Sequence, residues 1–135
     1  MAGALVRADG RFLLHQRHLA SAHGGLWEFP GGKIEGGESP ERALARELGE
    51  ELGIALECTA LNPVGFAASP QDSATGQRPI LIVLYACREW SGDPQCLEGE
   101  AIGWFAPDEI AGLAMPPLDV PLAARLIELL GAGLI

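Results

Sequence analysis

The sequence predicts an α/β sandwich, in which helices lie on opposite sides of a layer of β-strands. Three observations support this fold class. Short β-like runs recur along the chain, two other segments carry leucines at the spacing of one helix face, and 48% of the residues are apolar. A chain of 135 residues with this apolar content can bury a core, and it shows no internal repeat or linker. We therefore expect one domain over residues 1–135.

Three short strands are expected before the first helix. They cover residues 2–8, 11–17 and 26–29. The first two are joined by Asp9-Gly10, a dipeptide typical of tight turns, so they are expected to form a hairpin. Residues 18–25 are expected to be a loop, and the third strand ends at Pro30-Gly31-Gly32.

The first helix is expected to begin after Ser39 and to end at Gly53. Ser39 is a favourable N-cap, Pro40 suits the first helical position, and Gly53 suits the residue that follows the last turn. The leucines that should face the strands are Leu44, Leu48 and Leu52.

The second half of the chain is expected to add strands and two helices. The β-like runs are residues 55–60, 64–68, 80–90 and 100–105, with a turn over 72–77. Pro107 opens a short helix over residues 107–110, and Asp119-Val-Pro121 opens the last helix. The core-facing stripe of that helix is Leu122, Leu126, Leu129 and Leu130.

The composition excludes several classes of protein. A formal charge of −9 argues against duplex nucleic acid as a partner, because phosphate backbones are bound mainly by Lys and Arg. No apolar run approaches the roughly 20 residues of a membrane span, and the N-terminus does not resemble a signal peptide. The three cysteines show no CxxC spacing, so we expect reduced thiols in a cytoplasmic protein. A small phosphorylated ligand stays compatible with this charge, because a bound metal ion can supply positive charge locally.

The most informative segment is acidic. Seven glutamates lie between Glu35 and Glu57, and Glu47, Glu50 and Glu51 share one face of the expected helix. Like charges at this spacing destabilise a helix, whereas clustered carboxylates are the ligands that Mg²⁺ prefers. Glu51 falls beside the leucine stripe and should be the most buried of the three. The alternative is a solvated helix face without a function.

Residues 32–54 carry a pattern with many fixed positions. Gly32 is followed after five residues by Glu38, and after seven more by Arg46-Glu47, an aliphatic residue, one residue, Glu50-Glu51, one residue, Gly53 and Ile54. This segment resembles the Nudix box at every required position. The flanking stretches Leu26-Trp-Glu-Phe-Pro-Gly-Gly-Lys33 and Met115-Pro-Pro-Leu-Asp119 resemble the MutT branch of that family.

The resemblance implies a Nudix α/β/α sandwich with a mixed β-sheet between helices. It implies a hydrolase that uses Mg²⁺, or Mn²⁺ in its place, to cleave phosphoric anhydride bonds. The expected reaction is hydrolysis of a nucleoside triphosphate, such as 8-oxo-dGTP, to a monophosphate and pyrophosphate. This reaction would serve nucleotide-pool sanitation. The chain would act as a monomer or homodimer on a small nucleotide.

The resemblance also implies a role for each residue of the box. The expected metal ligands are Glu47, Glu50, Glu51 and the carbonyl of Gly31 or Gly32. Glu98 is expected to be a further ligand in preference to Glu100. Glu47 is expected to take the proton of the attacking water or to orient that water. Arg46 should hold the acidic face in place by reaching Glu50 or a loop carboxylate, and Glu38 should support it.

Contacts with the substrate are expected from outside the helix. The residues expected to bind the nucleotide are Arg17, His23, Glu28, Phe29, Pro30, Gly31, Lys33 and Asp119. Arg17 should reach the phosphates and Lys33 the departing phosphate. Phe29 should present its backbone or ring to the base, although an aromatic residue there could equally belong to the core.

Asp119 departs from the best-known MutT proteins, which have Asn at the corresponding position. An ionised Asp only accepts hydrogen bonds, so it favours a base that presents N–H donors, such as cytosine or guanine. The alternative for Asp119 is a helix cap. The alternatives for the whole chain are a CTP or dCTP pyrophosphohydrolase, a hydrolase of ADP-ribose or dinucleoside polyphosphates, and a nucleotide-binding module without turnover.

Overall fold

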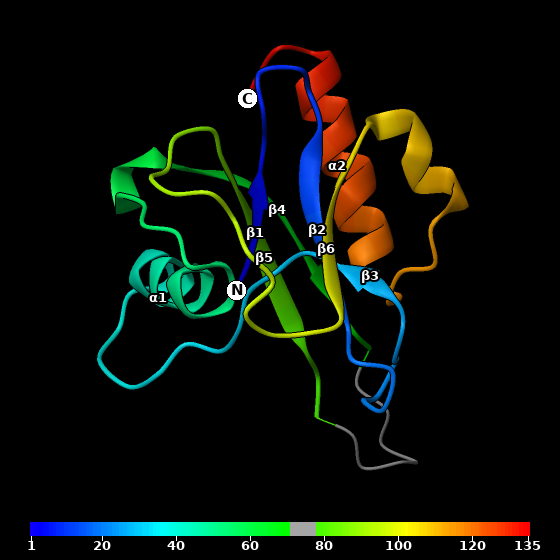
Figure 1. The fold of residues 1–135 in the computed structure, drawn as a ribbon, viewed down its shortest axis with the longest axis horizontal. Helices are drawn as coiled ribbons and strands as arrows, with labels where there is room; N and C mark the ends of the chain where they lie inside the picture. Colours follow the sequence, from blue (N-terminus) through cyan, green and yellow to red (C-terminus); the bar gives the residue numbers. More distant parts are fainter. Residues whose placement is uncertain (71–77) are drawn as a thin grey trace.

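In the computed structural model, which describes residues 1–70 and 78–135, the strands form two three-stranded sheets. The first sheet has the order β1 (Ala2–Leu5), β5 (Leu81–Cys87) and β4 (Leu61–Ala68). In it, β1 runs parallel to β5 and β4 runs antiparallel to β5. The second sheet is antiparallel and has the order β3 (Trp27–Glu28), β2 (Phe12–Gln16) and β6 (Ala101–Phe105) (Figure 1).

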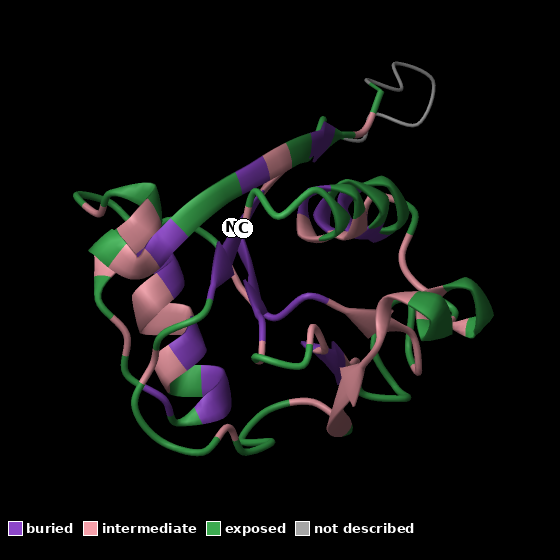
Figure 2. Cartoon of the chain, turned by 90° about the horizontal axis from the view of Figure 1, so that it is seen from above, coloured by how far each residue is buried: buried purple, intermediate pink, exposed green. Residues whose placement is uncertain are grey.

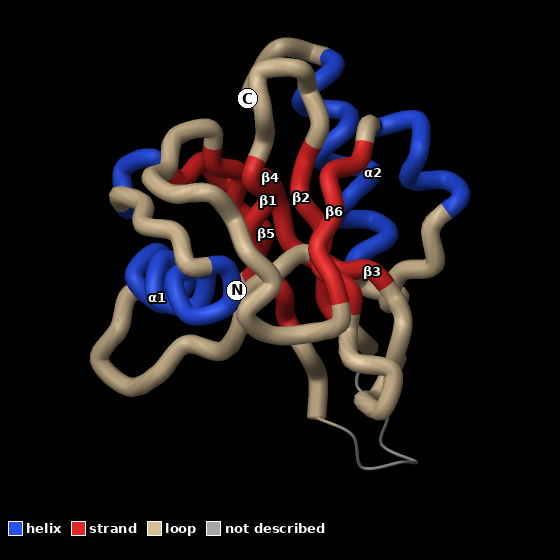
Figure 3. Tube along the Cα trace, in the orientation of Figure 1, coloured by secondary structure: helices blue, strands red, loops and turns tan. Residues whose placement is uncertain are grey.

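Two helices lie on opposite sides of these strands, α1 (Pro40–Leu52) and α2 (Asp119–Gly131) (Figure 3). Two 3₁₀ helices are also present, η1 (Cys58–Ala60) and η2 (Pro107–Gly112). The predicted α/β sandwich is confirmed, with the strands divided between a mixed and an antiparallel sheet.

The core has two halves because alternate side chains of the strands point to opposite helices. Phe12 and Leu14 of β2 join the cluster around α2, whereas Leu13 joins the cluster around α1. Each helix turns its leucine stripe inward, and Figure 2 shows buried faces on both helices directed toward the strands. Of the predicted stripes, only Leu130 is incompletely buried. The site described below lies where α1 meets the ends of β2 and β3.

Helix α1 has the predicted ends. The Ser39 hydroxyl accepts a hydrogen bond from the Arg42 N–H at 3.2 Å, and Pro40 occupies the first turn. Gly53 adopts a left-handed conformation with φ +71°, which glycine reaches without strain, and this ends the helix. These two ends fix which residues of α1 face the core and which face the site.

The predicted hairpin over residues 2–17 is wrong in its pairing. The turn itself is present, because the Arg7 N–H donates to the Arg11 carbonyl at 2.9 Å and Gly10 has φ +86°. The two strands separate after one bridge, Val6 to Phe12, and enter different sheets. Turn residues determine where the chain reverses, but the partner of each strand is decided by packing over long range.

The predicted strand over residues 55–60 is also wrong. Ala55 makes a single bridge with Ser91, and the chain then turns into η1. The other strands are confirmed as β4, β5 and β6, and the short helix after Pro107 is η2. The predicted turn over residues 72–77 lies outside the described residues.

Two further observations concern the cysteines and the helices. Cys58, Cys87 and Cys96 are free thiols. Within residues 1–70 and 78–135, no helix has the length and apolar character needed to cross a membrane.

Candidate active site

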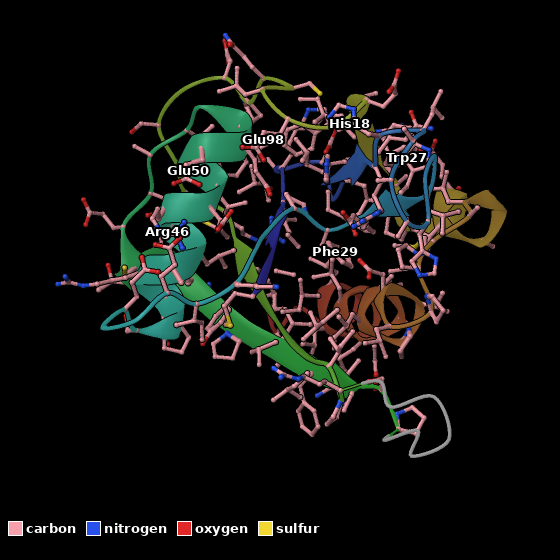
Figure 4. The ribbon with its side chains drawn as sticks, turned by 90° about the horizontal axis from the view of Figure 1, so that it is seen from below. His18, Trp27, Phe29, Arg46, Glu50 and Glu98 are labelled. Atoms are coloured by element: carbon pink, nitrogen blue, oxygen red, sulfur yellow. The ribbon has the colours of Figure 1, made fainter. Side chains whose placement is uncertain are left out.

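Arg46 joins the acidic face of α1 to the loop that precedes the helix. Its Nε and Nη2 donate to both carboxylate oxygens of Glu38, at 2.8 and 2.9 Å. Its Nη1 donates to Glu47 at 2.9 Å and reaches Glu50 at 3.4 Å. Figure 4 shows Arg46 and Glu50 along one side of the helix. Bidentate contacts of this kind are strong and directional, so Arg46 fixes the position of Glu47.

The same contacts change the proton affinity of both partners. Hydrogen bonding to Glu38 raises the pKa of Arg46 further above its ordinary value. Hydrogen bonding from Arg46 lowers the pKa of Glu38, so this carboxylate stays ionised. The expected contacts of Arg46 with Glu50 and with a loop carboxylate are therefore present.

Glu51 is the most enclosed glutamate of α1, as predicted from the helical wheel. The residue is 8% exposed, whereas the side chains of Glu47 and Glu50 are 17% and 53% exposed. Its Oε2 accepts a hydrogen bond from the Gly31 N–H at 3.0 Å. Burial raises the pKa of Glu51 to about 8, the Gly31 N–H opposes this shift, and Glu47 and Glu98 add to it.

Gly31 and Gly32 bring backbone atoms close to these carboxylates. A Cβ atom at Gly32 would overlap the carboxylate of Glu47, and one at Gly31 would overlap the Met1 carbonyl oxygen. The Gly32 carbonyl accepts a hydrogen bond from the Met1 nitrogen at 2.6 Å. Only glycine allows this approach, which explains why the loop ends in two glycines.

Glu51 opens into a cleft of about 430 Å³. The cleft is lined by His15, Arg17, His18, Ser21, Glu28, Gly31, Glu51, Leu97, Glu98 and Gly99. The loop that carries Glu98 is tied to α1, because the Leu97 N–H donates to the Glu51 carbonyl at 3.0 Å. Figure 4 shows Glu98 on this loop, between Glu50 and His18. Helix α1 and the loop before β6 thus contribute carboxylates to one cleft.

Glu98 and Glu100 are placed differently. Glu98 lines the cleft with Glu51, whereas the Glu100 carboxylate lies 3.7 Å from the His18 Nδ1 atom and is not part of the lining. Of the two glutamates, only Glu98 therefore shares the cleft with Glu51, and its role as a metal ligand stays a prediction.

The carboxylates do not converge on one point. Among the residues that the structure describes, no three side chains of the ligating types form a ready metal site. Glu47 instead faces Arg46, and Glu51 faces the Gly31 N–H.

Arg17 and Glu28, both predicted to bind the nucleotide, line the cleft and bind each other. The Arg17 Nη1 atom is 3.1 and 3.2 Å from the two Glu28 oxygens, and its Nε donates to the Ala22 carbonyl at 2.7 Å. Both side chains are partly buried. Lys33 is exposed, and its carbonyl accepts a hydrogen bond from Arg46.

Three other predicted substrate contacts do not face the cleft. The Phe29 ring is part of the core and packs against Phe12 with ring centroids 6.0 Å apart. Pro30 is fully buried, and its carbonyl accepts a hydrogen bond from Gly3. His23 is exposed in the loop after β2 and is not part of the lining. The Phe29 ring therefore belongs to the core, which is the alternative stated above, and the nucleotide contacts of Pro30 and His23 stay predictions.

Asp119 is buried, with 5% of its surface exposed, and also lies outside the cleft lining. Its Oδ2 accepts a hydrogen bond from the Phe29 N–H at 3.0 Å. It makes no side-chain cap for α2, whose N-cap residue is Leu118. Burial raises the pKa of Asp119 to about 6, and the Phe29 N–H opposes this shift. The alternative role as a helix cap is therefore wrong.

Sequence reasoning missed several lining residues, namely His15, His18, Ser21, Leu97 and Gly99. One signal was available. His15 interrupts the apolar run of β2 two residues before Arg17, and a polar ring in a buried strand needs a polar neighbour. The others come from loops whose position depends on long-range contacts.

Known proteins resemble this chain over nearly its whole length. A model of the NUDIX domain matches residues 1–130. The chain is 40% identical over 130 residues to the CTP pyrophosphohydrolase of Escherichia coli (strain K12), covering 96% of this chain and 91% of that protein. It is 32% identical over 131 residues to the 8-oxo-dGTP diphosphatase of the same strain, covering 96% of each.

A solved structure agrees with the fold. The MutT NUDIX hydrolase from Burkholderia pseudomallei matches with a TM-score of 0.73 and 37% sequence identity, covering 93% of this chain and 92% of that chain. The predicted family resemblance is confirmed. The chain therefore belongs to the Nudix family and is a MutT-like hydrolase, as the spacing of its box predicts.

Proposed function

We propose that the chain hydrolyses a nucleoside triphosphate to a monophosphate and pyrophosphate, with Mg²⁺ as its cofactor and Mn²⁺ as a substitute. The observation that carries this proposal is the cleft in which Glu51, buried on α1, lies with Glu98 on a separate loop. A buried carboxylate and a second, exposed carboxylate line this cleft from different elements and together attract a cation, and hard oxygen ligands select Mg²⁺ or Mn²⁺. A cytoplasmic location, where nucleoside triphosphates and Mg²⁺ are available, belongs to the same proposal.

The donor types present suit such an ion, and the carboxylates would have to turn toward one another to hold it. Its ligands would be Glu47, Glu50, Glu51 and Glu98, together with a carbonyl of the Gly31-Gly32 loop. When bound, the metal neutralises the charge of the polyphosphate and makes water a better nucleophile.

The chain contributes position and proton transfer. Arg46 holds Glu47 at 2.9 Å, so this carboxylate is oriented before substrate arrives. Glu47 then accepts the proton of the attacking water or orients that water. Glu38 keeps Arg46 in place through two hydrogen bonds, and the Gly31 N–H keeps Glu51 turned toward the cleft. Arg17 binds the phosphates and Lys33 reaches the departing phosphate.

Two bases are candidates for the nucleotide. The relatives named as 8-oxo-dGTP diphosphatase and CTP pyrophosphohydrolase support an oxidised guanine and cytosine respectively. Asp119 suits either base, since one oxygen already accepts from Phe29 and the other remains an acceptor for an N–H group of cytosine or guanine. Because Asp119 is buried, this contact requires local opening at the start of α2.

Initial rates of pyrophosphate release test the proposal. The panel is 8-oxo-dGTP, dGTP, CTP and dCTP with Mg²⁺, and each rate is measured in the wild-type chain and in Glu51→Gln. We expect turnover of at least one nucleotide that falls by at least about a hundredfold in the variant. Tight nucleotide binding without product would instead identify a binding module. Full activity in Glu51→Gln would refute the metal assignment.

A further inference from the structure

His15 is a buried polar side chain that the mechanism above does not use. It lies on β2 and is paired in register with Glu28 on β3. It is 9% exposed and lines the cleft beside Arg17. Its Nδ1 atom is fully buried and has no hydrogen-bond partner among the described residues. Burying a nitrogen without a hydrogen bond lowers the stability of the folded chain, so we expect His15 to have a function in the cleft.

The nearest acceptor for this nitrogen is already engaged. Glu28 Oε1 lies 3.6 Å from His15 Nδ1, which is too long for a hydrogen bond. Both oxygens of Glu28 face the Arg17 guanidinium instead, at 3.1 and 3.2 Å. Arg17 is thus paired with a protein carboxylate. Its Nε and Nη1 atoms are engaged by Ala22 and Glu28, so Arg17 can offer phosphate oxygens a contact through both Nη1 and Nη2 only by leaving Glu28.

We propose that His15 is a positioning residue that takes over Glu28 when Arg17 turns to the phosphates of the nucleotide. The His15 Nδ1–H then donates to Glu28, which closes the 3.6 Å gap and prevents an uncompensated carboxylate beside the substrate. This inference rests on the proposed function, because it assumes a phosphate-bearing ligand in the cleft. In this partner exchange, the Glu28 carboxylate gives up its hydrogen bonds with Arg17 and accepts one from His15.

The surroundings of His15 fix its ring while the exchange occurs. The backbone of Gly99 lies against the ring edge, so that a Cβ atom there would be 2.5 Å from both Cδ2 and Nε2. The carboxylate of Glu28, rather than the imidazole, is therefore the group that moves. Burial also lowers the pKa of His15, which favours a neutral ring with one N–H to donate.

Two substitutions separate this role from simple packing. Asn places an amide N–H near the position of Nδ1, whereas Gln places it near Nε2. We expect His15→Gln to raise KM for the preferred triphosphate about tenfold with little change in kcat, because Arg17 stays on Glu28. His15→Asn is expected to restore most of this loss. Equal KM values in the two variants, or an effect on kcat alone, would overturn the proposal.

The Glu28→Gln background supplies the matched control. A neutral side chain at residue 28 no longer competes for Arg17, so His15→Gln should change KM less than about twofold there. A tenfold rise in both backgrounds would show that His15 acts without Glu28 and would refute the exchange.

A spectroscopic measurement on the unaltered chain decides the inference independently of turnover and of variant folding. The His15 Nδ1–H resonance is followed by NMR while a non-hydrolysable α,β-methylene triphosphate is added. A downfield shift that saturates with binding is expected, and bound nucleotide without a shift would overturn the exchange. Absence of hydrolysis by the wild-type chain would refute the proposed function, while this shift would still report on His15.

Discussion

Phe29 and Asp119 are 90 residues apart and are joined by a buried hydrogen bond of 3.0 Å from the Phe29 N–H to Asp119 Oδ2. The bond links the end of β3 to the first turn of α2, so one carboxylate fixes the strand that leads into the glycine loop of the site. Asp119, which was expected to read the base or to cap a helix, therefore holds the end of β3 against α2.

The Asp119 carboxylate should make stability depend on pH. Its folded pKa of about 6 lies above the ordinary 3.8, so the folded chain binds this proton more tightly than the unfolded chain. The contribution is fully present below pH 3.8 and is lost as pH rises through 6, a change of about 3 kcal/mol. Asp119→Asn keeps an acceptor for Phe29 and removes the charge. We expect the Tm of the variant to exceed the wild-type Tm at pH 8 and to match it near pH 4. Thermal unfolding without metal at the two pH values measures this difference.

Ionisation of Glu51 should also lower the stability of the folded chain, over a higher pH range than ionisation of Asp119. Its pKa is raised from 4.5 to about 8, so its stabilising contribution is complete below pH 4.5 and is lost as pH rises through 8. Glu51→Gln should therefore raise the metal-free Tm at pH 8.5 by several degrees while abolishing activity. Added Mg²⁺ should stabilise the wild-type chain at this pH and leave the variant unchanged. A variant less stable than wild type at pH 8.5 would contradict the assignment of a destabilising buried charge.

The part of the site that sequence predicts well is the part carried by one helix. The stripe of Leu44, Leu48 and Leu52 fixes the rotation of α1, and this rotation alone places Glu51 inward and Glu50 outward. Ser39 and Gly53 fix its ends through local backbone chemistry. Local periodicity and caps are sufficient here because every relevant contact is within one element.

The rest of the site depends on contacts between distant segments. The sequence left the Phe29 ring open between the nucleotide and the core, and packing against Phe12 of β2 places it in the core. His15 and Gly99 meet only because β6 pairs with β2. Neither the direction of a side chain that follows a two-residue strand nor the partner of a strand follows from local pattern.

Arg46 should be important for metal binding although it is not part of the cleft lining. Arg46→Ala removes the bidentate contact with Glu38 and the contact with Glu47, so Glu47 loses its orientation. We expect kcat/KM to fall roughly a hundredfold and the Mg²⁺ concentration for half-maximal activity to rise roughly tenfold. Arg46→Lys should recover little, since one ammonium cannot replace the guanidinium fork. The control is Arg42→Ala, an exposed arginine of the same helix, and an equal loss there would show a general helix effect.

Glu98 and Glu100 offer a matched pair that tests the loop ligand. Both are exposed, both precede β6 and they differ by two positions, but only Glu98 lines the cleft with Glu51. Glu98→Gln should raise the Mg²⁺ concentration for half-maximal activity by about tenfold or more, because an amide is a weaker ligand than a carboxylate. Glu100→Gln should alter it by less than about twofold, because its carboxylate faces His18 at 3.7 Å. Titration of initial rate against Mg²⁺ measures both, and the opposite ranking would assign the ligand to Glu100.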